Sequence, residues 1–162
     1  MSRGLVSTPG DTRVSGIRSS LLTVCLWGSG MFGCSGVRPR DLGRRAGILR
    51  PCPDTPSCVS SETGTRESQR VAPLAAPGGP SELSRLAALV AAWPRTVVAT
   101  TTGTYLHAEF TSLVWRFADD VEFRYDASAS VIHVRSASRI GRGDLGANRK
   151  RVEGIRTEWE RR

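Results

Sequence analysis

The sequence is poor in several residue types that mark common functions. Lys150 is the single lysine among 23 basic residues, histidine occurs twice, and aromatic residues make up only 6% of the chain. A nucleic-acid surface usually interleaves aromatic side chains with basic ones, and this pattern is missing here. The formal net charge of +8 favours anionic partners in general. We therefore expect no nucleic-acid binding.

No apolar run is long enough to span a bilayer as a stable helix. The longest, residues 21–32 (LLTVCLWGSGMF), follows Arg18 and ends just before Gly33 and Cys34. A basic start, a short apolar core and a small residue before a Cys are typical of a secretory signal. This end resembles a bacterial lipobox, in which the Cys thiol receives a diacylglycerol. We expect residues 1–33 to be a leader and Cys34 the lipidation site, with an uncleaved anchor as the alternative.

Either outcome predicts a protein of the cell envelope, anchored to the membrane and facing the periplasm or the outside. Residues 34–50 are rich in Gly and Arg and lack an apolar face, so they are predicted to be a tether. Residues 51–162 are predicted to form a single globular domain, because they show no internal repeat and are too few for a second core.

Cysteine is scarce, and only Cys52 and Cys58 lie beyond the leader and the lipidation motif. Pro53 and Pro56 fix backbone angles and remove N–H donors, which excludes a helix interior or a central strand. In an oxidising compartment, a disulfide that closes this short loop is the favoured interpretation. A metal site and a redox-active pair are the alternatives, although the C-x-x-C spacing typical of both is absent.

Two helices are predicted in the globular part. The first spans residues 81–93, where leucines recur at helical spacing between Pro80 and Pro94. The second begins at Asp144, a good N-cap residue, and runs through Trp159. Its inward-facing residues are expected to be Leu145, Val152, Ile155 and Trp159.

Four strands are predicted between the helices, because apolar and polar residues alternate and the connections are short. Such consecutive strands form an antiparallel meander that is apolar on one face and polar on the other. The predicted fold class is α+β: a four- to five-stranded antiparallel meander sheet with two helices packed on one face. The strands are residues 96–102, 104–112, 120–125 and 131–138, with an edge strand near 70–74.

The polar face of this sheet offers candidate groups for chemistry. A His and a Glu there are the acid and base that an envelope enzyme would use. A metal site is disfavoured because the two histidines lie on non-adjacent strands, and no Ser or Cys sits in a nucleophile-elbow motif. We therefore expect no catalytic residue, metal or cofactor, and a solvated face with cross-strand ion pairs. The residues concerned are His107, Glu109, Glu122, Arg124 and His133.

The junction between the last strand and the second helix collects basic and polar residues. Guanidinium groups beside a helix N-terminus suit an anionic ligand. The competing interpretation is structural, with these arginines paired to nearby carboxylates such as Asp144. The predicted ligand-binding set is Arg135, Ser136, Ser138, Arg139, Asn148 and Arg149.

Several segments together resemble an uncharacterised bacterial and plastid family, the domain of unknown function 1499. They are CPDTPSCVSS at 52–61, YLHAEFTS at 105–112, RFADDVEF at 116–123 and VIHVRSASRIGRGDLGANRKRVE at 131–153. Ser57 stands where the family usually has Asn. The resemblance implies an N-terminal anchor or lipoprotein signal and implies no activity. We expect a monomeric, membrane-tethered binding or structural module for an anionic small molecule or an envelope protein, with an enzyme as the alternative.

Overall fold

The structure is a computed structural model that describes residues 38–39, 42–113 and 116–161. The expected leader, residues 1–33, and Cys34 lie outside the described residues. Within the described ranges, no helix is long and apolar enough to cross a membrane. The elements are β1 (Arg44–Arg45), β2 (Ile48–Leu49), β3 (Cys58–Ser60), the 3-10 helix η1 (Glu67–Gln69), β4 (Leu74–Ala75), α1 (Glu82–Ala91), β5 (Thr96–Thr101), β6 (Tyr105–Thr111), β7 (Ala118–Asp126), β8 (Val131–Ser138) and α2 (Ala147–Glu160).

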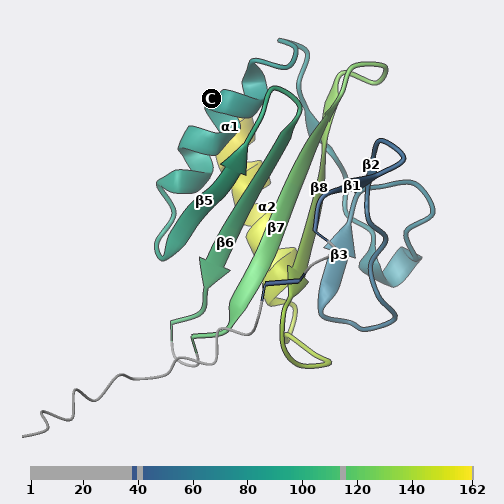
Figure 1. The fold of residues 1–162 in the computed structure, drawn as a ribbon, viewed down its shortest axis with the longest axis vertical. Helices are drawn as coiled ribbons and strands as arrows, with labels where there is room; N and C mark the ends of the chain where they lie inside the picture. Colours follow the sequence, from purple (N-terminus) through teal and green to yellow (C-terminus); the bar gives the residue numbers. More distant parts are fainter. Residues whose placement is uncertain (1–37, 40–41, 114–115, 162) are drawn as a thin grey trace, which may run out of the picture. The chain divides into compact units, whose positions relative to one another are not determined.

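A six-stranded sheet in the order β3-β8-β7-β6-β5 forms the centre of the domain, with β4 also paired to β8 (Figure 1). Strands β5 to β8 pair antiparallel with their neighbours in sequence, so the predicted meander and the α+β class are confirmed. The sheet has six strands rather than four or five because β3 also pairs with β8, while β4 lies at the end of the edge strand expected near 70–74. Strand β3 was missed because three residues after a prolyl loop show no alternation of apolar and polar residues.

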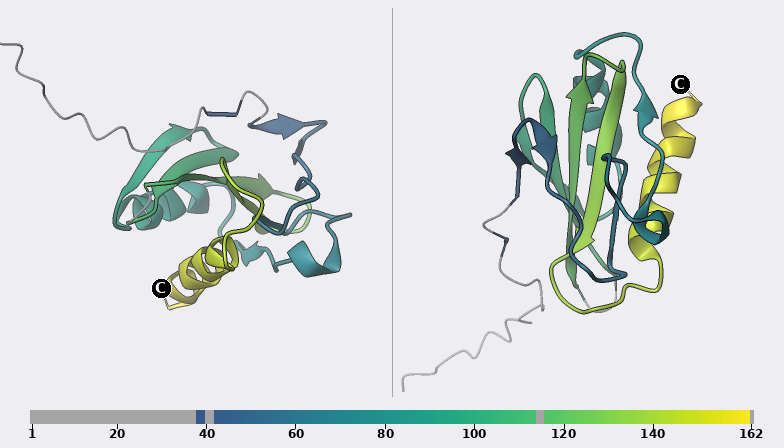
Figure 2. Two further views of the ribbon diagram at one scale, coloured as in Figure 1. Left: turned by 90° about the horizontal axis from the view of Figure 1, so that it is seen from below. Right: turned by 90° about the vertical axis from the view of Figure 1, so that its right-hand side faces the viewer.

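Both helices pack against the apolar face of the sheet, as predicted. Figure 2 shows α2 on one side of the sheet and the β1–β2 hairpin on the other. Gly154 lets the helices approach, since a Cβ there would lie 2.7 Å from the Trp93 ring. Burial of each large apolar side chain contributes roughly 1.5–3 kcal/mol. The core residues that are at most 1% exposed include Leu83, Leu86, Leu89, Val90, Leu106, Val121, Phe123, Ile132, Val134, Val152 and Ile155.

The start of the second helix differs from the prediction. Helix α2 begins at Ala147, after Gly146 in the left-handed region at φ 78°. The carboxylate of Asp144 accepts hydrogen bonds from the backbone N–H groups of Gly146 (2.9 Å) and Asn148 (2.8 Å), so it caps the helix from a preceding turn. Leu145 lies in that turn and is fully exposed, which makes its predicted inward orientation wrong.

The described part of the expected tether is folded. Strands β1 and β2 form a hairpin whose turn places Ala46 and Gly47 at positive φ. Leu49 is 1% exposed, and β2 contacts β7 and β8. Residues 42–50 show no apolar period in the sequence because this segment packs through one leucine and backbone N–H groups. The hairpin covers the polar side of the sheet.

Candidate functional site

The polar face of the sheet is buried rather than solvated. The strand register places His107, Glu122 and Arg135 side by side on β6, β7 and β8, with Glu109 beside Asp120 in the next row. The expected solvated face was therefore wrong, since His107, Glu122 and Arg135 are 3%, 0% and 8% exposed. We call this group the ionic layer; it consists of Glu62, His107, Glu109, Asp120, Glu122, Arg124, His133, Arg135 and Arg139.

Glu122 is the most deeply buried charge of the ionic layer. Its Oε2 accepts a hydrogen bond from Arg135 Nη1 at 3.0 Å. Its Oε1 accepts from the Tyr105 hydroxyl at 2.7 Å and from the Gly43 backbone N–H at 2.6 Å. Burial and the bond to Glu122 raise the pKa of Tyr105 well above its usual range, so this hydroxyl stays protonated as a donor. The carboxylate therefore joins the sheet to the segment that covers it.

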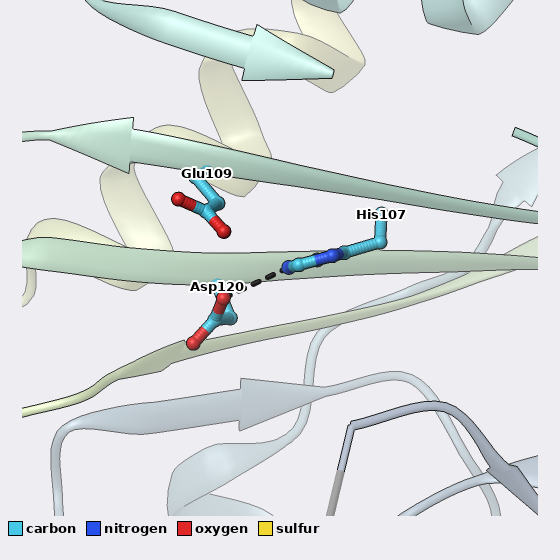
Figure 3. A group of neighbouring side chains, drawn as sticks. All are labelled: His107, Glu109 and Asp120. Carbon is cyan, nitrogen blue, oxygen red and sulfur yellow. Dashed lines mark hydrogen bonds and ion pairs between the residues drawn. The ribbon is translucent and has the colours of Figure 1, made fainter. Parts of the chain in front are cut away.

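A second cluster surrounds Asp120 (Figure 3). His107 Nε2 lies 2.8 Å from Asp120 Oδ1, and Arg139 donates to both Asp120 oxygens at 2.8 and 2.7 Å. Arg139 also lies 2.8 Å from Glu109, which accepts a further bond from Arg38 at 2.7 Å. Burial alone would raise the pKa of Asp120, but Arg139 and His107 outweigh it and lower that pKa.

The third cluster is centred on Glu62, which follows β3 and was not among the predicted residues. Arg124 donates to both Glu62 oxygens at 2.8 and 3.0 Å, and the Leu49 backbone N–H donates to Oε1 at 3.0 Å. His133 Nδ1 lies 3.8 Å from Glu62. Burial raises the pKa of Glu62, but Arg124 and Leu49 reverse this and lower it. Glu62 holds the hairpin against the sheet.

A metal ion fits this face poorly. Ligand atoms of His107, Glu109 and Asp120 lie within 4.8 Å of one another, a spacing that a divalent cation can bridge. However, the guanidinium of Arg139 already contacts both carboxylates and is 6% exposed, so it supplies the positive charge there. An added cation would be repelled by this buried arginine. The cluster is better described as an ion-pair network.

The predicted residues at the strand–helix junction divide between the two faces of the sheet. Ser136 donates to Asn148 Oδ1 at 2.5 Å, and Asn148 Nδ2 donates to Asp144 (2.7 Å) and to Ser138 Oγ (3.0 Å). These four residues lie on the helix side and link β8 to α2. Arg149 donates to the backbone oxygens of Arg70 and Ser68, away from this network. Arg151, which the sequence analysis did not include in this set, donates to Asn148 Oδ1 at 2.7 Å and pairs with Asp119.

Arg135 and Arg139 from the predicted ligand-binding set line one cavity of about 390 Å³ on the polar side, which we call the Arg135 cavity; Ser138 borders it from the end of β8, although its hydroxyl is bonded to Asn148 on the helix side. Pro51, Cys52 and Pro53, at the start of the loop that the Cys52–Cys58 disulfide closes, line the same cavity. The Nε of Arg135 is buried and has no hydrogen-bond partner among the described residues. A buried donor of a charged group left without a partner is costly. Arg135, one of the residues that line this cavity, therefore carries an unsatisfied donor.

Acid should destabilise the domain through the ionic layer. Because the folded-state pKa values of Asp120 and Glu62 are lowered, their contribution is complete above the ordinary values of 3.8 and 4.5 and is lost as the pH falls through the lowered ones. We expect the free energy of unfolding from urea denaturation to fall below about pH 4.5. The difference between the natural protein and Asp120→Asn should shrink over this range, and a constant difference would contradict the account.

The fold and the site define a small α+β domain with a buried ionic layer and a disulfide-closed loop on one side of its sheet. The chain belongs to the family described as protein of unknown function (DUF1499), whose sequence profile matches residues 48–159. The resemblance noted from the sequence motifs is confirmed by this match. A search of curated proteins and a search of solved structures each found no match to this chain. The matched region includes Leu49 and Glu62, which hold the cover of the polar face in place.

Proposed function

We propose that this chain is a membrane-tethered domain of the cell envelope that binds a small anionic molecule in the Arg135 cavity without transforming it. The observation that carries this proposal is the buried Arg135 Nε, which lacks a partner among the described residues. A carboxylate or phosphate oxygen is the acceptor that a guanidinium N–H accommodates best. Arg139 lines the same cavity and adds a second positive charge.

The carboxylates near the cavity do not oppose this proposal. Asp120 also lines the cavity, but its two oxygens are engaged by Arg139 and His107. Glu122 uses one oxygen for Arg135 and the other for Tyr105 and Gly43. Because these negative charges are directed at other donors, they leave the Nε of Arg135 without a partner among the described residues.

Two features support the envelope location. The apolar run at residues 21–32 ends at the Gly33-Cys34 pair, as expected for an exported and anchored protein. The Cys52–Cys58 disulfide fits an oxidising compartment. The loop that it closes contributes Cys52 and Pro53 to the lining of the Arg135 cavity. The shape of the proposed binding site therefore depends on a disulfide that forms in an oxidising compartment.

Isothermal titration of the full chain in detergent micelles with inorganic phosphate and with succinate tests the binding site. Arg135→Lys keeps the charge beside Glu122 but removes the Nε donor. Losing one charged hydrogen bond of roughly 1.5–3 kcal/mol should weaken binding about 10- to 100-fold. The matched control is Arg149→Lys, whose guanidinium donates to Ser68 and Arg70 and does not line this cavity.

Equal affinity of the natural protein and Arg135→Lys for both anions would contradict the proposal. So would the absence of saturable heat with either anion. If Arg149→Lys lost as much affinity for the anions as Arg135→Lys, the anions would have to bind on the other side of the domain, which would also contradict the proposal.

The enzyme alternative has less support. His107 and Asp120 lie 2.8 Å apart, as in an oriented acid–base pair. His107 is only 3% exposed, however, and Asp120 is held by Arg139. The buried pair is better suited to structure than to turnover.

A further inference from the structure

Three exposed apolar side chains lie in the loops at one end of the domain, apart from Ile48 on β2 and Val97 on β5. Leu113 is 71% exposed, Ile140 is 39% exposed and Leu145 is fully exposed. They belong to the loops that follow β6 and β8, and a shared hollow of about 300 Å³, lined by Ser112, Phe117, Ile140 and Leu145, joins the two loops. We call Leu113, Ile140 and Leu145 the apolar tip. Exposed large apolar groups concentrated in this way mark a contact surface.

The conformation of Leu145 adds weight to this observation. Its φ of 52° lies in the left-handed region, where a leucine side chain is disfavoured. No burial inside the domain offsets this conformational cost, since the Leu145 side chain is fully exposed. A leucine held outward at an energetic cost is expected where an apolar environment outside the domain receives it. Two exposed basic residues, Arg116 and Arg142, lie in the same loops.

The chain leading to the membrane reaches the domain near this same end. The apolar run ends at Phe32, six residues before Arg38. Six residues span at most about 20 Å even when fully extended. Arg38 is bonded to Glu109, two residues before the end of β6 and so close to the loop that carries Leu113. A lipid on Cys34, or an uncleaved leader embedded in the bilayer, therefore keeps this end of the domain close to the membrane surface.

We infer that the apolar tip is a membrane-docking surface. Leu113, Ile140 and Leu145 enter the interfacial layer of the bilayer, and Arg116 and Arg142 lie against anionic headgroups. The inference rests on the membrane tether of the proposed function and adds an orientation to it. Ser138 and Arg139 of the Arg135 cavity directly precede Ile140, so docking sets that cavity beside the headgroup layer.

Photolabelling of the full chain in vesicles tests this orientation. The vesicles contain about one third anionic lipid and a phospholipid with a diazirine on its acyl chain. Adducts, localised by fragmentation mass spectrometry, are expected on Leu113 and Leu145. Ile48 is the internal control, because it is 42% exposed but lies on β2, in the hairpin whose Arg44 is bonded to Thr104 at the other end of β6.

The double variant Leu113→Ser/Leu145→Ser should carry at least about fivefold fewer adducts in residues 112–146, whereas Ile48→Ser should leave them unchanged. Adducts confined to residues 1–37 would overturn the docking surface and leave the tether standing. No adducts on any part of the chain would overturn both. Equal labelling of Ile48 and Leu145 would overturn the docking surface as well, because it would mean that no end of the domain is preferred.

Discussion

Glu122→Gln is expected to lower the free energy of unfolding by roughly 3–5 kcal/mol, the usual cost of removing one partner of a buried ion pair. The carboxylate is 0% exposed and accepts bonds from Arg135, Tyr105 and Gly43. Glutamine keeps the shape but leaves the Arg135 charge buried without its counter-ion. It also turns one acceptor into a donor that faces either Arg135 or Tyr105. Urea denaturation followed by circular dichroism measures the loss.

Glu153→Gln is the matched control for Glu122→Gln. Glu153 is paired with Arg156 one turn away on α2, and its side chain is 47% exposed. An exposed pair of this kind contributes at most about 1 kcal/mol. Similar losses in the two variants would mean that the charges on the polar side of the sheet are solvated, which would contradict the ionic layer.

Asn148→Ala is expected to cost roughly 2–4 kcal/mol, because several buried polar groups lose their partner at once. Asn148 is 0% exposed. Its amide accepts from Ser136 and Arg151 and donates to the Ser57 backbone oxygen, Ser138 and Asp144. These bonds join β8, α2 and the loop before β3. Thermal and urea unfolding both report the change.

Asn148→Asp separates the two halves of this network. The aspartate keeps an acceptor for Ser136 and Arg151 but replaces the donor with an oxygen that faces Asp144 and the Ser57 carbonyl. It should therefore destabilise the domain about as much as alanine does, in spite of its matching shape. Thr157→Ala on the exposed side of α2, where the hydroxyl bonds only the Glu153 carbonyl, should cost no more than about 0.5 kcal/mol. An Asn148→Asp variant as stable as the natural protein would refute this description of the junction.

The sheet and the helices could be predicted from the sequence because their signal is local. Alternation along residues 131–138 and the leucine period of residues 81–93 each follow from burial of one face. The Cys52–Cys58 pairing, favoured on spacing and compartment, is present in the structure. The family could be recognised because its motifs lie in the strands and loops that form the core and the polar face.

The cover of the polar face could not be predicted in this way. It depends on contacts between residues far apart in sequence, such as Gly43 with Glu122 and Glu62 with Arg124. The hairpin packs through backbone N–H groups and a single leucine, so its sequence shows no periodic spacing of apolar residues that would indicate burial. The alternation of polar residues on β6 to β8 was recognised, but whether such a face meets water or a second layer is decided by the segment that folds over it. The polar residues of this face were recognised in the sequence, while their burial was not.

Because the polar face of the sheet is buried and not solvated, its arginines are interpreted differently than from the sequence alone. Arg139 is paired with Asp120 and Glu109 through its Nε and Nη2 atoms. Arg135 has one nitrogen engaged with Glu122 and one buried nitrogen without a partner among the described residues. Ser136 and Asn148 link helix to sheet, whereas Arg135 lines the cavity to which the ligand-binding proposal applies.

The Nε–Hε resonance of Arg135 in a ¹⁵N-labelled protein tests the central claim most directly, because this group is the proposed donor to the ligand. Arg135→Lys identifies the signal by its disappearance. On addition of inorganic phosphate or succinate, the account predicts a saturable shift of this resonance, with the Arg149 signal unmoved. If the Arg135 Nε–Hε resonance does not shift at saturating concentrations of phosphate or succinate, the account is contradicted.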